Sequence, residues 1–223
     1  MGKFIIVVMI IAVGIFGGMG LYNFFNKSAV TDTYGSALNQ ATTPAPTNNK
    51  TSQADTPTAQ LGTDWVATLS AHPISSTAAT IKTVKGDISI VLYPQDAPKT
   101  VENFATLSKY GYYNKLTFHR VEPGFVIQGG DPNGNGTGGV SIFGPTFEDE
   151  LNASTPSYQA GYQTGVLAMA NRGPHTNGSQ FFIMLADNQS LPKNYTIFGK
   201  VTSGMDVVRK IEVSDKIYGI DIQ

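Results

Sequence analysis

The fold is decided by one stretch of the sequence, Phe118-His119-Arg120-Val121-Glu122-Pro123-Gly124-Phe125-Val126-Ile127-Gln128-Gly129-Gly130-Asp131. Its apolar runs, Leu116–Val121 and Phe125–Gln128, predict two short strands, because β-branched and aromatic residues dominate them. Pro123-Gly124 stands between the runs and is typical of a turn. Since side chains alternate along a strand, three residues are expected to share one face of the first strand: Leu116, Phe118 and Arg120.

Short apolar runs of the same kind occur on both sides of this stretch. They predict five further strands, over Ala79–Val84, Ile88–Tyr93, Gly165–Ala170, Gln180–Leu185 and Thr196–Val201. Turn residues separate the runs, among them Lys85-Gly86-Asp87 and Asp131-Pro132-Asn133-Gly134. The chain from Ala79 onward is therefore rich in strands.

Two helices are predicted among these strands. The first has Asp96 as its N-cap, Pro98 in its first turn and Gly111 as its C-terminal stop. Its inward-facing residues are expected to be Val101, Phe104, Ala105 and Ser108. The second helix covers about Met205 to Glu212, and its apolar face carries Val207, Val208 and Ile211. Many strands with two helices indicate a β-barrel or sandwich whose open ends the helices close.

Composition narrows the classes of function. The chain has 223 residues and a net charge of −1, so acidic and basic residues nearly balance. This balance argues against a nucleic-acid-binding protein, which requires a basic surface. The sequence has no cysteine, which excludes disulfides, thiol catalysis and iron–sulfur ligation. Only 14 % of the residues are charged, against about 25 % in typical domains, so a lipid-facing segment or an uncharged linker is expected.

Residues 1–27 have the pattern of an N-terminal transmembrane anchor. No charged residue occurs between Lys3 and Lys27, which leaves 23 uncharged positions, residues 4–26. A helix of that length measures roughly 34 Å, enough to span a hydrocarbon core of ~30 Å. The run is longer than the apolar part of a signal peptide, and no small-x-small cleavage site follows it. An uncleaved anchor with a cytoplasmic N-terminus is therefore favoured over a cleaved leader and a secreted domain.

The rest of the chain divides into two zones. Residues 28–63 are rich in Thr, Ala, Asn, Gln, Ser and Pro, and they predict a disordered linker, because they offer too little apolar surface to offset the entropy of ordering. Residues 64–223 are expected to form the folded domain, which is long enough for one core.

Several catalytic patterns fail in this domain. His119 and Glu122 are three positions apart in a predicted strand, which sends them to opposite faces rather than to one metal ion. The run Gly134–Gly139 fits the dinucleotide-binding motif G-x-G-x-x-G. That motif requires a helix directly after it, and the residues that follow do not have a helical pattern, so the run is interpreted as a glycine-rich loop. The acidic run Glu148–Glu150 is interpreted as a solvated turn. Neither a metal nor a cofactor is expected.

Seven runs remain, in a fixed order: Lys85–Asp87, Ala97–Phe104, Phe118–Asp131, Gly136–Gly139, Phe147–Glu150, Asn177–Phe182 and Phe198–Val201. Together they resemble the cyclophilin-type peptidyl-prolyl cis–trans isomerases over roughly residues 78–212. The resemblance implies a closed eight-stranded antiparallel barrel capped by two α-helices, with the substrate groove on its outer wall. It also implies an enzyme that accelerates rotation about X-Pro bonds.

The resemblance implies that Arg120 is the catalytic residue. Rotation of an X-Pro bond crosses a barrier of ~18–20 kcal/mol set by amide resonance, and no bond is broken. In the twisted transition state the prolyl nitrogen regains a lone pair, so a donor aimed at that nitrogen stabilises this state selectively. Arginine offers such donors on a group that is always charged.

The resemblance also implies which residues hold the peptide. Those expected to line the proline pocket are Phe125, Val126, Phe182 and Leu191. The flanking carbonyls are expected to be fixed by Gln128 and by the backbone at Asn171. The adjoining groove is expected to be shaped by Gly136, Ala170, Arg172 and Gln180.

Two positions depart from the family pattern. Ser190 stands where the family often has a tryptophan before the pocket leucine, and Tyr195 stands where it often has a histidine. Tyrosine keeps an aromatic wall with a polar tip, whereas loss of the indole removes apolar area and a donor. The sequence therefore predicts weak binding of the cyclic peptide cyclosporin and intact catalysis.

The leading hypothesis is a membrane-tethered prolyl isomerase that acts outside the cytoplasm. Its expected partners are proline-containing segments of unfolded or folding proteins and, through residues 4–26, a membrane. The domain itself is expected to be monomeric. The alternative is a non-catalytic module of the same fold that grips proline-containing segments as a chaperone or scaffold. Arg120 favours the enzyme, because a pure binder does not need a donor aimed at the prolyl nitrogen.

Overall fold

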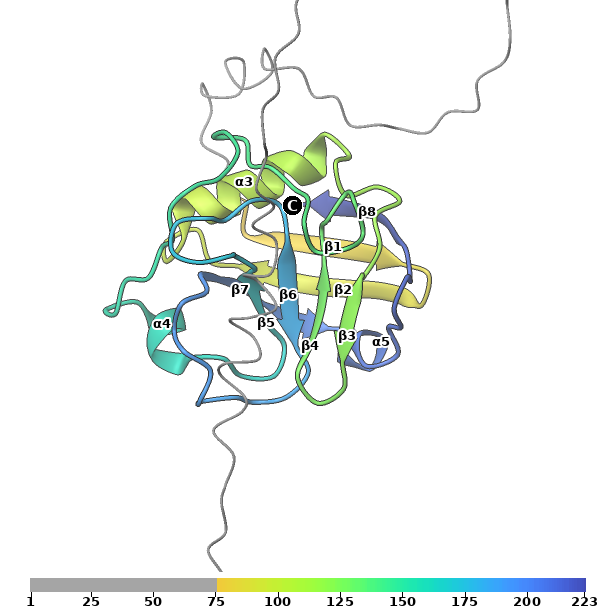
Figure 1. The fold of residues 1–223 in the computed structure, drawn as a ribbon. Helices are drawn as coiled ribbons and strands as arrows, with labels where there is room; N and C mark the ends of the chain where they lie inside the picture. Colours follow the sequence, from red (N-terminus) through yellow and green to blue (C-terminus); the bar gives the residue numbers. More distant parts are fainter. Residues whose placement is uncertain (1–75) are drawn as a thin grey trace, which may run out of the picture. The chain divides into compact units, whose positions relative to one another are not determined.

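A single antiparallel sheet dominates the computed structural model, which describes residues 76–223. Its eight strands are β1 (Ala78–Thr83), β2 (Gly86–Leu92), β3 (Arg120–Glu122), β4 (Val126–Gly129), β5 (Val166–Met169), β6 (Phe181–Met184), β7 (Ile197–Ser203) and β8 (Ile217–Ile222). They are ordered β3-β4-β6-β5-β7-β2-β1-β8 (Figure 1). In the part of the chain that the structure describes, no helix is long and apolar enough to cross a membrane. The predicted anchor and linker, residues 1–63, lie outside that part.

The sheet is curled rather than closed by a continuous ladder. Figure 1 shows β1 and β2 crossing β4 and β6 at a steep angle. The two edge strands, β3 and β8, do not pair with each other within residues 76–223. Thr117 instead forms isolated antiparallel bridges to Asp131 and Lys216. The predicted eight antiparallel strands are confirmed, and the predicted closed barrel is corrected to a curled sheet whose edges are joined by isolated bridges and loop hydrogen bonds rather than by a continuous ladder.

All seven predicted strands occur, with ends shifted by at most four residues. β8 was not predicted, because Gly219 and Asp221 interrupt its apolar pattern. One side-chain assignment is wrong: Phe118 belongs to the core cluster, whereas Arg120 contacts Gln128 outside that cluster. The cause is that β3 begins only at Arg120. Phe118 lies before the strand, where its backbone N–H bonds to the carbonyl of residue 215 rather than to β4.

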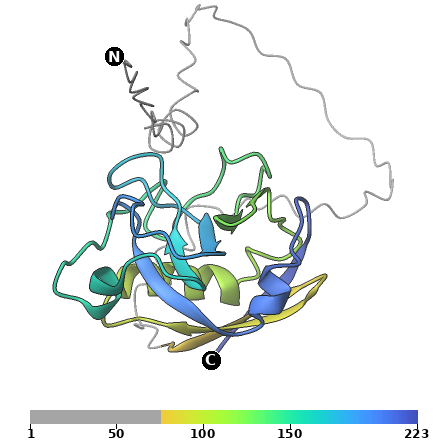
Figure 2. The same ribbon diagram turned by 90° about the horizontal axis from the view of Figure 1, so that it is seen from below.

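The core lies inside the curl of the sheet. Helix α3 (Pro98–Lys109) buries all four residues predicted to face inward. The ring of Phe104 meets the ring of Phe181 from β6 edge-on, with centroids 5.6 Å apart. Figure 2 shows α3 between the β1–β2 and β5–β6 strands, and α5 (Met205–Val208) contacts β2. The helices therefore cover the core as the sequence predicts.

The N-terminus of α3 is capped from a distance. Its N-cap is Ala97, which makes no side-chain capping bond. Glu150 accepts hydrogen bonds from the backbone N–H groups of Lys99 (3.0 Å) and Thr100 (2.8 Å). A carboxylate is favoured at this position because the helix N-terminus carries partial positive charge. The interpretation of Glu148–Glu150 as a solvated turn is therefore wrong for Glu150.

Asp96, predicted to cap α3, serves another helix. Its carboxylate accepts a hydrogen bond from the N–H of Ser157, 2.9 Å away, in the first turn of α4 (Pro156–Ala160). This five-residue helix was not predicted, because it is too short for a periodic pattern. The helix predicted over Met205–Glu212 is also shorter than expected. Beyond Val208 the chain forms tighter i→i+3 bonds, which end α5 early.

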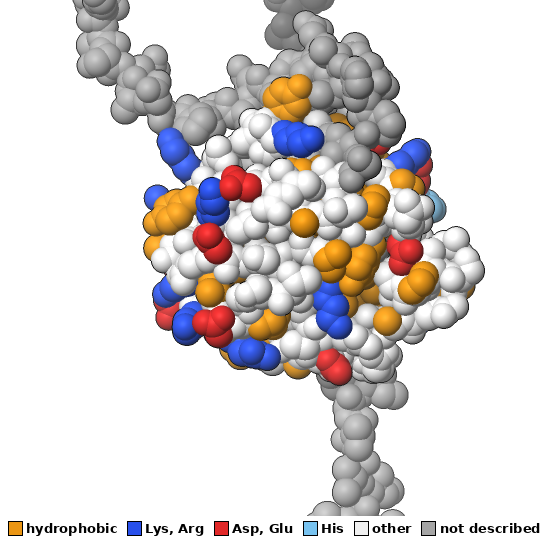
Figure 3. Space-filling model, turned by 180° about the vertical axis from the view of Figure 1, so that it is seen from behind, with side chains coloured by type: hydrophobic (Ala, Val, Ile, Leu, Met, Phe, Trp, Pro, Cys, Tyr) orange, Lys and Arg blue, Asp and Glu red, His pale blue; other side chains and the backbone are white. Residues whose placement is uncertain are grey.

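Charged side chains of both signs are mixed on the surface. On the face shown in Figure 3, Lys or Arg side chains lie beside Asp or Glu side chains. Exposed ion pairs join Lys82 to Asp221 (2.6 Å) and Lys85 to Glu212 (2.7 Å). That face therefore presents no large patch of one sign.

Candidate active site

The outer face of β4 and β6 carries the residues predicted to form the proline pocket and groove. Ile127 and Phe181 belong to the core cluster. Their sequence neighbours Val126, Gln128 and Phe182 are also buried, yet none of them belongs to that cluster. Because successive side chains of a strand point to opposite faces, these three residues form a second wall outside the core. This wall is the framework of the candidate site.

Strand register aligns the central residues of the wall. Arg120 pairs with Gln128, Gln128 pairs with Phe182, and Phe182 pairs with Ala168. The row therefore crosses β3, β4, β6 and β5. The sheet places the predicted catalytic arginine, a polar amide and an aromatic ring of the predicted pocket next to one another.

Arg120 is held from several sides. Its Nη1 donates to Oε1 of Gln128 at 3.3 Å, and its Nε lies 3.6 Å from Oε1 of Glu122. The guanidinium carbon lies 5.7 Å from the ring centre of Phe125. The side chain is 18 % exposed. Burial lowers the pKa of Arg120 from its usual value, and the charge of Glu122 opposes that change. A guanidinium is nevertheless protonated at every physiological pH.

An amide chain connects Arg120 to the glycine-rich loop. Nε2 of Gln128 donates to Oε1 of Gln180 at 2.9 Å. Nε2 of Gln180 then donates to the carbonyls of Gly138 (2.8 Å) and Gly136 (3.1 Å). Each amide thus has its orientation fixed by a partner on either side. The predicted groove residues Gly136 and Gln180 are brought together with Arg120.

The glycine-rich loop is organised by Asp131, a residue that was predicted only as part of a turn. Its buried carboxylate accepts hydrogen bonds from the backbone N–H groups of Asn133 (2.9 Å), Asn135 (3.0 Å) and Gly136 (2.5 Å). A Cβ atom on Gly138 would clash with Oδ1 of Asp131, and because three hydrogen bonds hold that carboxylate in place, glycine is favoured there. The loop interpretation is confirmed, since no helix follows Gly139.

Aromatic rings close the other side of the wall. The rings of Phe182 and Tyr195 meet edge-on at 5.5 Å. Tyr162 contacts both of these residues. Its ring centre lies 6.5 Å from that of Phe182. Its hydroxyl donates a hydrogen bond to the Tyr195 carbonyl and accepts one from the Tyr195 N–H, each at 3.0 Å. Burial raises the pKa of Tyr162, so the hydroxyl stays protonated. Leu191 is buried on the same loop, outside the core cluster.

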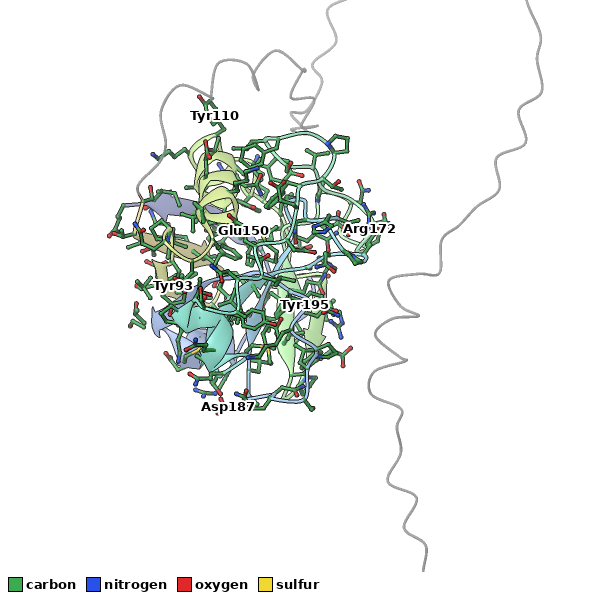
Figure 4. All side chains as sticks on the ribbon, turned by 90° about the vertical axis from the view of Figure 1, so that its left-hand side faces the viewer. Tyr93, Tyr110, Glu150, Arg172, Asp187 and Tyr195 are labelled. Carbon is green, nitrogen blue, oxygen red and sulfur yellow. The ribbon has the colours of Figure 1, made fainter. Side chains whose placement is uncertain are left out.

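The other residues predicted to shape the groove lie in the segment after β5. The N–H of Ala170 donates to the Gln180 carbonyl at 3.0 Å. The amide of Asn171 donates to the Asn194 carbonyl at 2.8 Å, so its side chain is used to hold the Tyr195 loop. Arg172 is exposed, and its Nη1 donates to the carbonyl of Thr137 at 3.0 Å. Figure 4 shows Arg172 and Tyr195 on the side of the domain away from α3.

Tyr162 and Asp149 are supporting residues that sequence reasoning missed. Asp149 was assigned to a solvated turn, but its side chain is 4 % exposed. It accepts hydrogen bonds from the amide of Asn177 (2.8 Å) and the N–H of His175 (2.8 Å). Tyr162 belongs to no predicted strand or helix. The nearby Asn177–Phe182 run was a signal that this region is structured, but it did not reveal these partners.

Comparison with known proteins shows the family of the chain. Residues 78–219 match the family described as cyclophilin type peptidyl-prolyl cis-trans isomerase/CLD. The chain therefore belongs to the cyclophilin-type peptidyl-prolyl cis–trans isomerase family, as the sequence resemblance predicts.

Individual relatives show how far the similarity extends. "Peptidyl-prolyl cis-trans isomerase-like 1" of Emericella nidulans is 48 % identical over 136 residues, which cover 61 % of this chain and 82 % of that protein. "Peptidyl-prolyl cis-trans isomerase cyp15" of Rhizopus delemar is 51 % identical over 146 residues, or 66 % of this chain, but this chain spans only 22 % of that protein. A crystal structure of a cyclophilin from Cryptosporidium parvum is 36 % identical, with a TM-score of 0.60, and covers 66 % of this chain and 98 % of its own.

Proposed function

We propose that this chain is a peptidyl-prolyl cis–trans isomerase in which Arg120 is the catalytic residue. The observation that carries the proposal is the position of Arg120 beside the apolar side chains of Phe125, Val126 and Phe182. Relatives about 50 % identical to this chain are named peptidyl-prolyl cis-trans isomerases. A second crystal structure of the Cryptosporidium parvum cyclophilin was determined in the presence of the dipeptide Ala-Pro.

The geometry suits rotation about an X-Pro bond. A proline ring placed against Phe182 and Val126 would be held by apolar contact, while Arg120 lies on β3, one strand from Val126 and two strands from Phe182. Loss of amide resonance in the twisted state returns a lone pair to the prolyl nitrogen, which then accepts a hydrogen bond. A donor that meets this nitrogen only in the twisted state lowers the barrier without binding the planar forms more tightly.

The polar residues of the wall would fix the rest of the peptide. Gln128 holds Arg120 on one side, and Gln180 fixes Gln128 in turn. Because this network is formed before substrate arrives, the donors need little reorganisation during the reaction. Tyr195, Leu191 and the backbone at Asn171 would complete the pocket and bind the flanking chain.

The test is the isomerisation rate of an Ala-Pro peptide with the full chain, beside Arg120→Ala. Loss of one preorganised donor is expected to lower kcat/KM by about 10²–10³-fold. The matched control is Arg209→Ala, which removes an exposed arginine at the end of α5. Circular dichroism should show unchanged folding in both variants. A folded wild-type chain that binds the peptide without accelerating rotation would favour the non-catalytic proline-binding module.

We also propose that residues 4–26 anchor the chain and that the isomerase domain lies outside the cytoplasm as a monomer. Support comes from the uncharged run between Lys3 and Lys27. The full chain should resist extraction from membranes at alkaline pH, and its intact mass should include the first residues. A soluble product of lower mass would indicate the cleaved, secreted form. Light scattering of the detergent-solubilised chain measures its oligomeric state.

A further inference from the structure

Glu122 is an exposed acid at the edge of the candidate site. It lies on β3 two residues after Arg120 and pairs with Val126, which lines the apolar wall. Its side chain is 53 % exposed, compared with 18 % for Arg120. Its spacing from His119 does not favour a shared metal ion. Strand register instead places it one row beyond the Arg120–Gln128–Phe182 row.

The carboxylate of Glu122 has capacity for another partner. Its contact with Arg120 is a long ion pair, with Oε1 3.6 Å from Nε, and 53 % of the Glu122 side chain stays exposed to solvent. An ionised carboxylate has about four lone-pair positions for donors. Two other acids near the wall differ in this respect: Asp131 and Asp149 are buried, and backbone and amide N–H groups occupy their oxygens. Glu122 is thus available to a ligand.

The residues of the proposed groove run between two side chains of opposite charge. Rows on the same face of a strand are roughly 7 Å apart, because each residue rises about 3.3 Å. Val126 and Glu122 form one row, Arg120, Gln128 and Phe182 the next, and Gln180 lies beyond. Past Gln180 stands the exposed Arg172, bound to the carbonyl of Thr137. An extended peptide also advances about 3.3–3.6 Å per residue. A side chain one or two residues from a bound proline therefore reaches Glu122.

We propose that Glu122 is a specificity-determining residue that favours substrates with lysine or arginine one or two positions from the isomerising proline. The proposal rests on the proposed function, since it assumes that the proline lies against Phe182. It deepens that function by naming a substrate class, basic proline-containing segments. A cation at this position gains attraction from Glu122, whereas an acidic residue is repelled by the same carboxylate.

The expected effect is modest because the pair is partly exposed to water. We expect kcat/KM for a peptide with lysine to exceed that for a matched peptide with glutamate by about two- to fivefold at low ionic strength. Salt screens exposed pairs, so the ratio should fall toward one as ionic strength rises.

The experiment uses the full chain and peptides Ala-Ala-Pro-Ala in which each position beside the proline carries Lys, Gln or Glu in turn. The measured quantity is the ratio of kcat/KM for Lys to Glu at each position. Glu122→Gln should bring the ratio to about one, and Glu122→Lys should invert it. The matched control is Asp221→Asn on β8, an acid that is 56 % exposed and paired with Lys82. It should keep the wild-type ratio.

The Lys-to-Glu ratio of kcat/KM distinguishes a role of Glu122 in specificity from a role in positioning Arg120. If Glu122 only positioned Arg120, Glu122→Gln would slow all peptides equally and leave the ratio unchanged, which would overturn the proposal. A wild-type ratio of one at every position would overturn it as well, while acceleration of all peptides would leave the isomerase function standing. If the wild-type chain accelerates none of the peptides, the proposed function and this inference fail together.

Discussion

Phe181 and Phe182 are neighbours in β6 and both are buried, yet they serve opposite faces of one sheet. The ring of Phe181 packs against Phe104 of α3, inside the curl. The ring of Phe182 packs against Tyr162 and Tyr195, which come from segments outside the strands. The difference teaches that burial alone does not separate a core residue from a candidate binding residue. The neighbouring side chains separate them. Around Phe181, inside the curl, they are mostly aromatic or aliphatic, whereas around Phe182, on the outer face, they include hydrogen-bonded amides and a guanidinium.

The largest expected effect comes from truncating the inner ring. Phe181→Ala removes a ring from the closed core and should lower the free energy of unfolding by about 3–5 kcal/mol. Phe182→Ala should cost less stability, because Phe182 lies outside the core cluster, but it should reduce kcat/KM more than stability explains. Urea denaturation and peptide kinetics measure the two effects. Equal losses of stability would mean that the outer wall is a second core.

The next effect tests the amide chain of the outer face. Gln180→Leu leaves the buried N–H of Gln128 without its acceptor, which costs about 1–3 kcal/mol. Gln128 would then orient Arg120 less well, so we expect kcat to fall with little change in KM. Gln159→Leu, on the exposed α4, is the control and should change neither quantity. If Gln180→Leu left kcat unchanged, the amide chain would have no positioning role.

A third prediction concerns the incomplete edge of the outer wall. Ser190 is exposed beside Leu191 and bonds only locally, its hydroxyl lying 2.8 Å from Oδ1 of Asn188. We expect weak cyclosporin binding by the wild-type chain, and Ser190→Trp should strengthen it about tenfold, ~1.4 kcal/mol, because an indole adds apolar area and a donor. Titration calorimetry measures the affinity, with Ser190→Ala as the control. Tight binding by the wild type would contradict the prediction.

The smallest expected effect is a pH dependence of the free energy of unfolding, caused by His119. This residue lies between Phe118 of the core and Arg120 of the outer face. Burial lowers the pKa of His119, and neither ring nitrogen has a hydrogen-bond partner among residues 76–223. The unfolded chain then binds a proton more readily than the folded chain. Stability should therefore fall as pH drops through the unfolded pKa, ~6.5, and level off below the folded one.

Thermal unfolding at pH 7.5 and 5.5 measures this effect, and His119→Gln should reduce the difference. The control is His175→Gln, which alters an exposed histidine. An unchanged pH dependence in His119→Gln would show that carboxylates cause it instead.

Most of the fold could be predicted because strand patterns are local. The runs that became β2, β4 and β6 are short apolar runs separated by turn residues, and these signals need no knowledge of distant parts. The resemblance supplied the site, since Arg120, Gln128 and Phe182 lie in runs typical of the family. The register then brought these three residues together, as a sheet must when its strands are correctly paired.

The rest could not be predicted because it depends on contacts between distant residues. Local sequence offers Asp96 as a cap for α3, but the cap is Glu150, which no local rule connects to that helix. Asp149 and Tyr162 support the site in the same way, through partners more than twenty residues away. The face of Phe118 was assigned wrongly because the sequence does not show where β3 begins.

The cap of α3 also affects how the domain unfolds locally. Glu150 closes a loop of 50 residues when it bonds to Thr100. Closing such a loop carries an entropic cost that a local cap avoids. The carboxylate of Glu150 thus protects the amides of Lys99 and Thr100 from solvent hydrogen exchange, and release of the segment around Glu150 exposes them. A helix that looks autonomous in the sequence is therefore one half of a cooperative unit, whose other half lies beside the wall that would hold the substrate.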